Sequence, residues 1–230
     1  MKKIINALLE RLNLRLVNTS RIGVNYYTDI KRTNCPIYTA LDIGANIGEV
    51  SKNLLQYFPN SSVHAFEPIQ ENFSHLDKID SPRLTKNNLA VGNYDGEVKI
   101  YLNSHSGLHS PLVVEDQDKF QIVKQCKLDT YCQNQGLERL GIVKIDTEGG
   151  DLLVLEGLQK YLENKTVDFL ILETTFYDSH RHISIDQYIE FLKPYEYYVY
   201  GVYDQSSEWN KKARIQYANV LFARYGIEVT

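Results

Sequence analysis

Cysteine is scarce in this sequence. Cys35, Cys126 and Cys132 are the only three, and no two of them form a CxxC pair. An odd number of cysteines without paired spacing predicts neither a disulfide framework nor a structural zinc site. Such cysteine usage is typical of a reducing compartment, so we expect a cytoplasmic protein.

Long apolar runs and an excess of basic residues are also missing. No stretch reaches the roughly 18 apolar residues that a membrane-spanning helix requires. The formal net charge is −4, whereas nucleic-acid-binding domains usually carry clustered positive charge. We therefore expect no transmembrane segment and no nucleic-acid partner. The composition, 43% hydrophobic and 23% charged, is that of an ordinary globular protein.

The length of 230 residues suits one domain, and we expect it at 36–230, after a helical extension at 1–35. Within the extension, apolar residues recur at helical spacing and basic residues accompany them: Ile5, Leu8, Leu9, Leu12 and Leu16, with Lys2, Lys3, Arg11 and Arg15. Charged residues interrupt the apolar segment, which argues against a signal peptide. We predict that its apolar face packs on the domain. A peripheral contact with the inner membrane surface is the alternative.

Strands alternate with helices along the rest of the chain, which predicts an α/β fold with a parallel sheet. Expected strands are 38–45, 62–67, 84–91, 141–147 and 167–173, and expected helices are 47–58, 70–79, 128–139, 151–162 and 184–193. Residues 195–203 and 217–225 predict two last strands that pair as an antiparallel edge. Between the third strand and the helix at 128, further strands at 97–103 and 120–127 flank a polar loop.

A glycine turn follows the first expected strand. Gly44 permits a tight turn, and Gly48 lets the next helix begin close to the strand. The N-terminus of that helix offers unpaired N–H groups that suit a carboxylate or a phosphate. Glu67 ends the second strand, nineteen residues after Gly48. A carboxylate there can accept hydrogen bonds from both ribose hydroxyls of an adenosine.

The spacing of the turn discriminates between adenosine cofactors. In a GxGxxG register that starts at Gly44, the second and third glycines would fall on Asn46 and Glu49. Asn46 would crowd a pyrophosphate and Glu49 would repel it. Asp42, just before the turn, suits the ammonium group of S-adenosylmethionine, so the pattern favours that cofactor. A nicotinamide-dependent oxidoreductase on the same fold, or a binding module with a degenerate nucleotide pocket, is the alternative.

Acidic residues gather where two later strands end. Asp146 and Glu148 lie in the stretch KIDTEGGD at 144–151, and Glu173 ends the next strand. Because the carboxyl ends of parallel strands face the ligand crevice, these three carboxylates are candidates to orient or deprotonate an acceptor. His180, in the loop that follows, is a fourth candidate. The carboxylates are hard oxygen ligands, but no spacing requires a metal, so none is predicted.

Several stretches resemble the FkbM-type methyltransferases. They are LDIGANIGEVS at 41–51, VHAFEPIQENFSHL at 63–76, NNLAVGNYDGEVKIYLN at 87–103, IVKIDTEGGDLLVLEGLQKYL at 142–162 and FLILE at 169–173. The resemblance implies a Rossmann-like class I methyltransferase fold, with a mostly parallel seven-stranded sheet and an antiparallel edge strand. It implies S-adenosylmethionine as the methyl donor and O-methylation of a hydroxyl on a sugar or glycan precursor. N-methylation of a small amine or a phosphorylated small molecule is the alternative.

The resemblance also assigns the cofactor contacts. It implies that the methionyl part contacts Asp42, Gly44, Asn46 and Gly48, and that the ribose contacts Glu67. It implies that the adenine lies near Asn88 and Ala90, and that the sulfonium lies beside Asp146. Neither the residues nor the resemblance indicates an oligomeric state.

Overall fold

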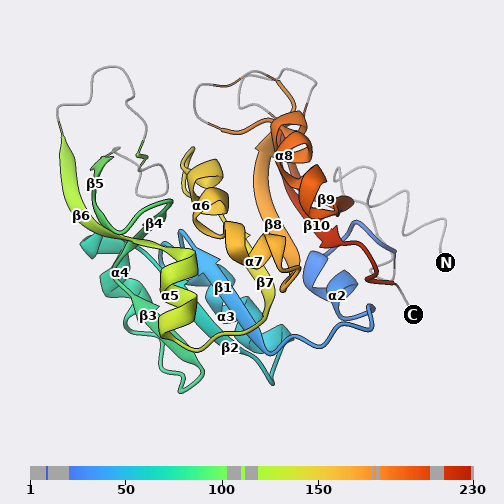
Figure 1. The fold of residues 1–230 in the computed structure, drawn as a ribbon, viewed down its shortest axis with the longest axis horizontal. Coiled ribbons are helices and arrows are strands. Elements are labelled where there is room, and N and C mark those ends of the chain that lie inside the picture. The colour runs from blue at the N-terminus through green and yellow to red at the C-terminus, as the bar shows by residue number, and fades with distance from the viewer. Residues whose placement is uncertain are drawn as a thin grey trace.

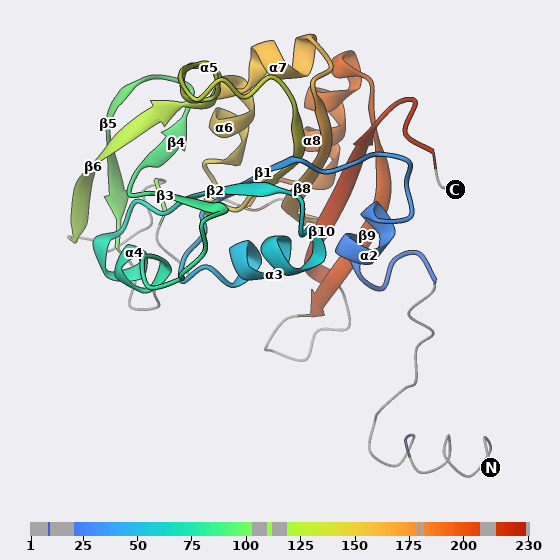
Figure 2. The same cartoon turned by 90° about the horizontal axis from the view of Figure 1, so that it is seen from below.

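The computed structural model describes residue 9 and residues 21–102, 110–111, 119–177, 179, 182–207 and 215–228. Within these residues the chain forms three layers, with one large sheet between two sets of helices (Figures 1 and 2). Apart from Leu9, the predicted amphipathic face at the N-terminus lies outside the described residues. Its packing on the domain stays a prediction.

The middle layer is a seven-stranded sheet with the order β3-β2-β1-β7-β8-β10-β9. Its strands are β1 (Thr39–Ile43), β2 (Ser62–Phe66), β3 (Leu84–Asn87), β7 (Leu140–Ile145), β8 (Val167–Thr175), β9 (Tyr197–Ser207) and β10 (Ile215–Arg224). Strands β3, β2, β1, β7 and β8 run parallel, whereas β10 is antiparallel to both β8 and β9. The predicted fold class is confirmed. Strands β9 and β10 form the antiparallel end of the sheet, with β9 at the edge and β10 between β8 and β9.

Helices cover both faces of this sheet (Figure 2). One face carries α2 (Tyr26–Ile30), α3 (Glu49–Tyr57) and α4 (Gln70–Leu76), and the other carries α5 (Leu128–Asn134), α6 (Asp151–Gly157), α7 (Gln159–Glu163) and α8 (Ile185–Leu192), with the 3-10 turn η2 (Lys193–Tyr195) after α8. None of the described helices combines the length and hydropathy needed to cross a bilayer.

Each central strand contributes to two hydrophobic cores, because successive side chains point to opposite faces of a sheet. In β1, Leu41 and Ile43 pack with α5–α8, whereas Ala40 packs on the side of α2 and α3. Strand β7 is buried along its whole length, and so are both of its neighbours' central residues. The one helix predicted at 151–162 is two helices, α6 and α7, which meet at the buried Leu158.

Helix α2 joins the second of these cores, although it falls inside the predicted extension at 1–35. Its residues Tyr26, Tyr27 and Ile30 are buried. Tyr203 on β9 donates a hydrogen bond to Asp29 Oδ2 at 2.9 Å, which ties the helix to the edge of the sheet. The division into an extension and a domain at residue 36 stays a prediction.

A second, three-stranded sheet lies beside the carboxyl ends of β1 and β2, and the sequence did not predict it. It contains β4 (Ala90–Gly92), β6 (Phe120–Lys127) and β5 (Gly96–Tyr101), in that spatial order. The strand expected at 84–91 divides into β3 and β4. Asn88 stands at the division, where its side chain donates to the carbonyl oxygens of Glu67 and Pro68. The chain therefore leaves the main sheet there and enters the small one.

Candidate functional site

A pocket of about 240 Å³ lies between the carboxyl ends of β1, β2 and β7 and the three-stranded sheet. The main sheet contributes Gly44, Asn46, Glu67, Asp146, Thr147 and Glu148 to its wall. The small sheet contributes an apolar side with one amide, formed by Ala90, Val91, Val98, Ile100 and Gln125. A pocket at this edge of an open α/β sheet is the usual position for a bound ligand.

The turn after β1 brings two segments into backbone contact. Gly44 has φ +77°, and a β-carbon on it would lie 1.8 Å from the carbonyl oxygen of Asp146. Gly48 has φ +86°, and a β-carbon there would lie 2.3 Å from Ile79 Cδ1. The backbone contact requires glycine at position 44, whereas at position 48 the positive φ and the nearby side chains favour it. The tight turn predicted at Gly44 is present, and its contact with the cofactor stays a prediction.

Glu67 lies at the end of β2 and is 5% exposed. Its Oε2 accepts a hydrogen bond from the backbone N–H of Asn46 at 2.9 Å, and its Oε1 accepts one from the N–H of Ile69 at 2.9 Å. Burial raises the pKa of Glu67 to about 7, against the opposing effect of these hydrogen bonds. The carboxylate is therefore fixed beside the glycine turn, on the wall of the pocket.

Buried charges extend from the turn to the end of β7. Asp42 accepts a hydrogen bond from Ser51 Oγ at 2.6 Å, and burial raises its pKa. Lys144, the neighbour of Asp42 across the β1–β7 ladder, donates to Asp146 Oδ2 at 2.6 Å. Burial disfavours the charged lysine, but Asp146 and Asp42 outweigh it and raise the pKa of Lys144. Asp146 is thereby held at the strand end by a buried cation.

Asp151 fixes the loop between β7 and α6, a role that the sequence analysis did not assign to it. Its Oδ1 accepts hydrogen bonds from the N–H of Thr147 at 2.8 Å and from Thr147 Oγ1 at 2.5 Å. Its Oδ2 accepts one from the hydroxyl of Tyr188 on α8, at 2.9 Å. The buried carboxylate thus connects the loop to α8, which covers the same face of the sheet as α6.

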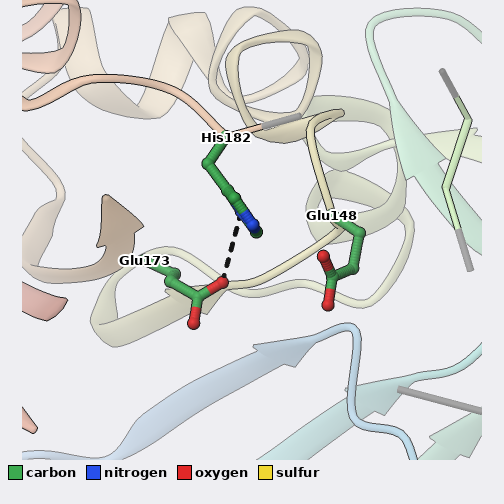
Figure 3. Close-up of side chains that lie close together, drawn as sticks. All are labelled: Glu148, Glu173 and His182. Atoms are coloured by element: carbon green, nitrogen blue, oxygen red, sulfur yellow. Dashed lines mark ion pairs between the residues drawn. The ribbon is translucent and has the colours of Figure 1, made fainter. Parts of the chain in front are cut away.

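Two carboxylates and one imidazole converge beside the pocket, where Glu148 forms part of the wall. Glu148 comes from the β7–α6 loop, Glu173 from β8 and His182 from the segment before α8, and Figure 3 shows the imidazole between the two carboxylates. One ligand atom from each lies within 4.8 Å of the others. His182 Nδ1 is 3.5 Å from Glu173 Oε2. Burial, followed by the charges of Asp146 and Glu148, raises the pKa of Glu173 to about 8.

Asp146 and Glu148 follow β7 closely in the sequence, but they have different side-chain partners. β7 ends at Ile145, and Glu148 has φ +56° in the turn that follows. The alternation of a strand therefore does not extend to it. Asp146 pairs with Lys144, while Glu148 lies with Glu173 and His182.

Most of the predicted residues lie at this edge of the sheet. Of the predicted cofactor residues, Gly44, Asn46, Glu67, Ala90 and Asp146 line the pocket, whereas Asp42, Gly48 and Asn88 are not wall residues. Of the predicted catalytic residues, Asp146 and Glu148 line it, Glu173 adjoins Glu148, and His180 lies outside the described residues.

The sequence analysis missed His182 as a site residue and missed the wall that the small sheet provides. For His182, the signal was its place in the same loop as His180. For Val98, Ile100 and Gln125 there was no signal, because a strand pattern does not tell which sheet a strand joins.

Comparison with known proteins identifies the family. The model of the methyltransferase FkbM domain matches residues 42–200, and no curated protein matches the chain. Similar solved structures include TrmK from M. capricolum with S-adenosyl-homocysteine (10% identity, 92% of this chain and 70% of that one, TM-score 0.48). An rRNA methylase from Streptococcus thermophilus is 12% identical over 86% of this chain and 93% of that one, with a TM-score of 0.49.

A further solved structure, an S-adenosylmethionine-dependent methyltransferase from Clostridium acetobutylicum, is 11% identical over 98% of this chain and 99% of that one, with a TM-score of 0.44. The family match carries the assignment, since it spans more than half of the sequence and contains the glycine turn, Glu67 and the acidic strand ends. The chain belongs to the FkbM methyltransferase family and is an S-adenosylmethionine-dependent methyltransferase.

Proposed function

We propose that this methyltransferase modifies a hydroxyl group of a sugar or glycan precursor. The observation that carries the proposal is the group of Glu148, Glu173 and His182 beside the pocket. A hydroxyl is weakly acidic and must lose its proton as it is methylated, whereas a neutral amine can attack without such help. The carboxylates or the imidazole of this group can accept that proton as a general base. The arrangement therefore favours O-methylation over N-methylation of an amine.

The residues at the β1 turn fit the methyl donor. Asp42 Oδ1 and Asn46 Oδ1 are buried without a hydrogen-bond partner within the described part of the chain. Buried polar atoms are usually paired, and the ammonium group of the methionyl part can donate to them. In the proposed site, Gly44 and Gly48 let the backbone approach the methionyl part, and Glu67 accepts hydrogen bonds from the ribose hydroxyls.

Two further residues complete the donor site that we propose. Asn88 and Ala90 lie where the chain passes from β3 to β4, and they flank the adenine. When bound, the donor supplies a methyl group on a cationic sulfonium. Asp146 lies at the pocket wall with its carboxylate held by Lys144, and it orients the acceptor beside that methyl group. Alignment of this kind is a large part of what an enzyme contributes to a displacement reaction.

The acidic surroundings of the pocket bear on the class of acceptor. Glu148 lines it, Glu173 lies beside Glu148, and the whole chain has a formal charge of −4. These acids would repel a polyanionic nucleic acid, because its binding normally depends on neutralisation of phosphates by basic residues. A neutral, hydroxyl-rich acceptor has no such cost.

Methyl transfer from labelled S-adenosylmethionine tests the proposal directly. The acceptors to compare are nucleotide-activated sugars, free sugars, small amines and RNA oligonucleotides. We expect label in a sugar as a base-stable methyl ether, with loss of transfer in Glu67→Gln and full transfer in Glu71→Gln, an exposed acid on α4. Label found only in amines or only in RNA would contradict the acceptor class.

We also propose that the protein works in the cytoplasm; as the alternative to packing of the N-terminal segment on the domain, residues 1–20 contact the inner membrane surface. The basic and apolar residues of this segment support the idea. Deletion of residues 1–20 is expected to reduce sedimentation with anionic lipid vesicles. Equal sedimentation of the two forms would remove the membrane contact from the proposal.

A further inference from the structure

Three metal-ligating side chains meet outside the donor part of the pocket, and they come from three separate segments. Glu148, Glu173 and His182 offer two carboxylate oxygens and one imidazole nitrogen within 4.8 Å of one another (Figure 3). The side chains of Glu173 and His182 are 19% and 20% exposed, so solvent and ions can reach them. We propose that these three residues bind a divalent cation that positions and activates the acceptor hydroxyl.

The geometry of the group suits a cation with octahedral coordination. Neighbouring ligand atoms around such an ion lie about 3 Å apart when each metal–ligand distance is about 2.1 Å. His182 Nδ1 and Glu173 Oε2 are already 3.5 Å apart. One carboxylate oxygen of Glu148 lies within 4.8 Å of both atoms, so the three can become one face of the coordination shell if they approach to about 3 Å. Two carboxylates and one imidazole suit Mn²⁺ and related ions, and carboxylates also suit Mg²⁺.

The charge around the group favours a cation as well. Asp146 and Asp151 add negative charge close to Glu173, and Lys144 is the cation that opposes it. Lys144, however, is hydrogen-bonded to Asp146. A divalent ion between Glu148 and Glu173 would offset the repulsion between these carboxylates, which is the usual reason that clustered acids bind metals.

The position of the group links the cation to the reaction. Glu148 is both a ligand of the proposed ion and a wall residue of the pocket. Three protein ligands leave three octahedral positions for acceptor oxygens and water. Two neighbouring sugar hydroxyls can occupy two of them, so the site would select acceptors with a vicinal diol. The selection of vicinal diols rests on the proposed function.

The chemical step is then balanced without a further reactant. The cation lowers the pKa of the bound hydroxyl, whose proton passes to water. The oxygen forms a bond to the methyl carbon as the carbon–sulfur bond breaks. The electron pair of that bond remains on sulfur, which becomes neutral.

Mn²⁺ binding, followed by electron paramagnetic resonance of the free ion, tests the site without any acceptor. We expect the full chain to bind one Mn²⁺, and Glu148→Gln, Glu173→Gln and His182→Gln each to bind it at least about tenfold more weakly. Glu190→Gln, an exposed acid on α8, is the matched control and is expected to bind Mn²⁺ like the unmodified chain. Mg²⁺ is expected to displace Mn²⁺.

Urea denaturation shows which variants are folded without relying on the pocket, which Glu148 shares with Glu67 and the glycine turn. Two results would overturn the metal site: no Mn²⁺ binding by the unmodified chain at millimolar ion, or equal binding in the three folded variants. If Mn²⁺ binds as expected but no sugar is methylated, the metal site stands and the proposed acceptor is wrong. If sugars are methylated at full rate in the presence of a chelator, the acceptor stands and the role of the cation is wrong.

Discussion

Protonation of Glu67 is expected to control how tightly the protein binds the adenosine part of its donor. The carboxylate is 5% exposed and burial raises its pKa from 4.5 to about 7. Hydrogen bonds from two ribose hydroxyls favour the ionised form. At pH 6, about one unit below that pKa, roughly a tenth of the molecules carry the ionised carboxylate, so binding is expected to be about tenfold weaker than above pH 8.

The raised pKa of Glu67 also makes the free energy of unfolding depend on pH. The pKa is raised in the folded state, so the folded protein retains a proton that the unfolded chain has lost between pH 4.5 and about pH 7. The free energy of unfolding of the cofactor-free protein therefore falls as pH rises through this window. A pKa difference of about 2.5 between the folded and unfolded states corresponds to roughly 3 kcal/mol of stability. This contribution is fully present below pH 4.5 and is lost above about pH 7.

Calorimetric titration with 5′-methylthioadenosine isolates the effect. This ligand carries the adenosine ribose but lacks the ionisable amino and carboxyl groups of the methionyl part. We expect affinity to rise from pH 6 to pH 8, and proton release at pH 6.5 that appears as a heat dependent on the buffer. Glu71→Gln is expected to behave like the unmodified protein, and Glu67→Gln to bind weakly at every pH. A flat pH profile without proton release in the unmodified protein would refute the assignment of Glu67 to the ribose.

Three substitutions test the geometry around the site by urea denaturation. Gly44→Ala is expected to cost more than about 3 kcal/mol, because its β-carbon would lie 1.8 Å from a backbone oxygen at a positive φ. Gly136→Ala, at φ +65° with open space around it, is expected to cost only about 1 kcal/mol; equal losses would contradict the close approach at Gly44. Tyr188→Phe removes the donor to Asp151 and is expected to cost about 1–3 kcal/mol. A free energy of unfolding unchanged by Tyr188→Phe would show that this hydrogen bond contributes little.

The sequence predicted the main sheet well, because its strands are short apolar runs separated by turn residues. Strands β1, β2, β7 and β8 lie within two residues of their expected bounds. Glycines with a steric role, such as Gly44, marked the tight turn after β1. These signals are local, so they can be read from the chain without knowledge of the packing.

The sequence failed where the outcome depends on contacts between distant segments. The expected strand at 84–91 gave no sign that the chain would change sheets at Asn88, which depends on hydrogen bonds to the carbonyl oxygens after β2. β7 ends at Ile145, so Glu148 lies in the following turn and its place beside Glu173 and His182 depends on the packing of distant segments. His182 became a partner of Glu173 only because the loop before α8 folds back over β8.

The three-stranded sheet has a consequence for how the shape of the pocket can vary. It shares no paired strand with the main sheet among the described residues, and its strands come from one continuous part of the chain, 90–127. It meets α6 where Gly157 lies against the carbonyl of Gly92. The apolar wall of the pocket therefore belongs to a unit separate from the main sheet. Substitutions within it can reshape the pocket while the registers that hold Gly44, Glu67 and Asp146 stay intact.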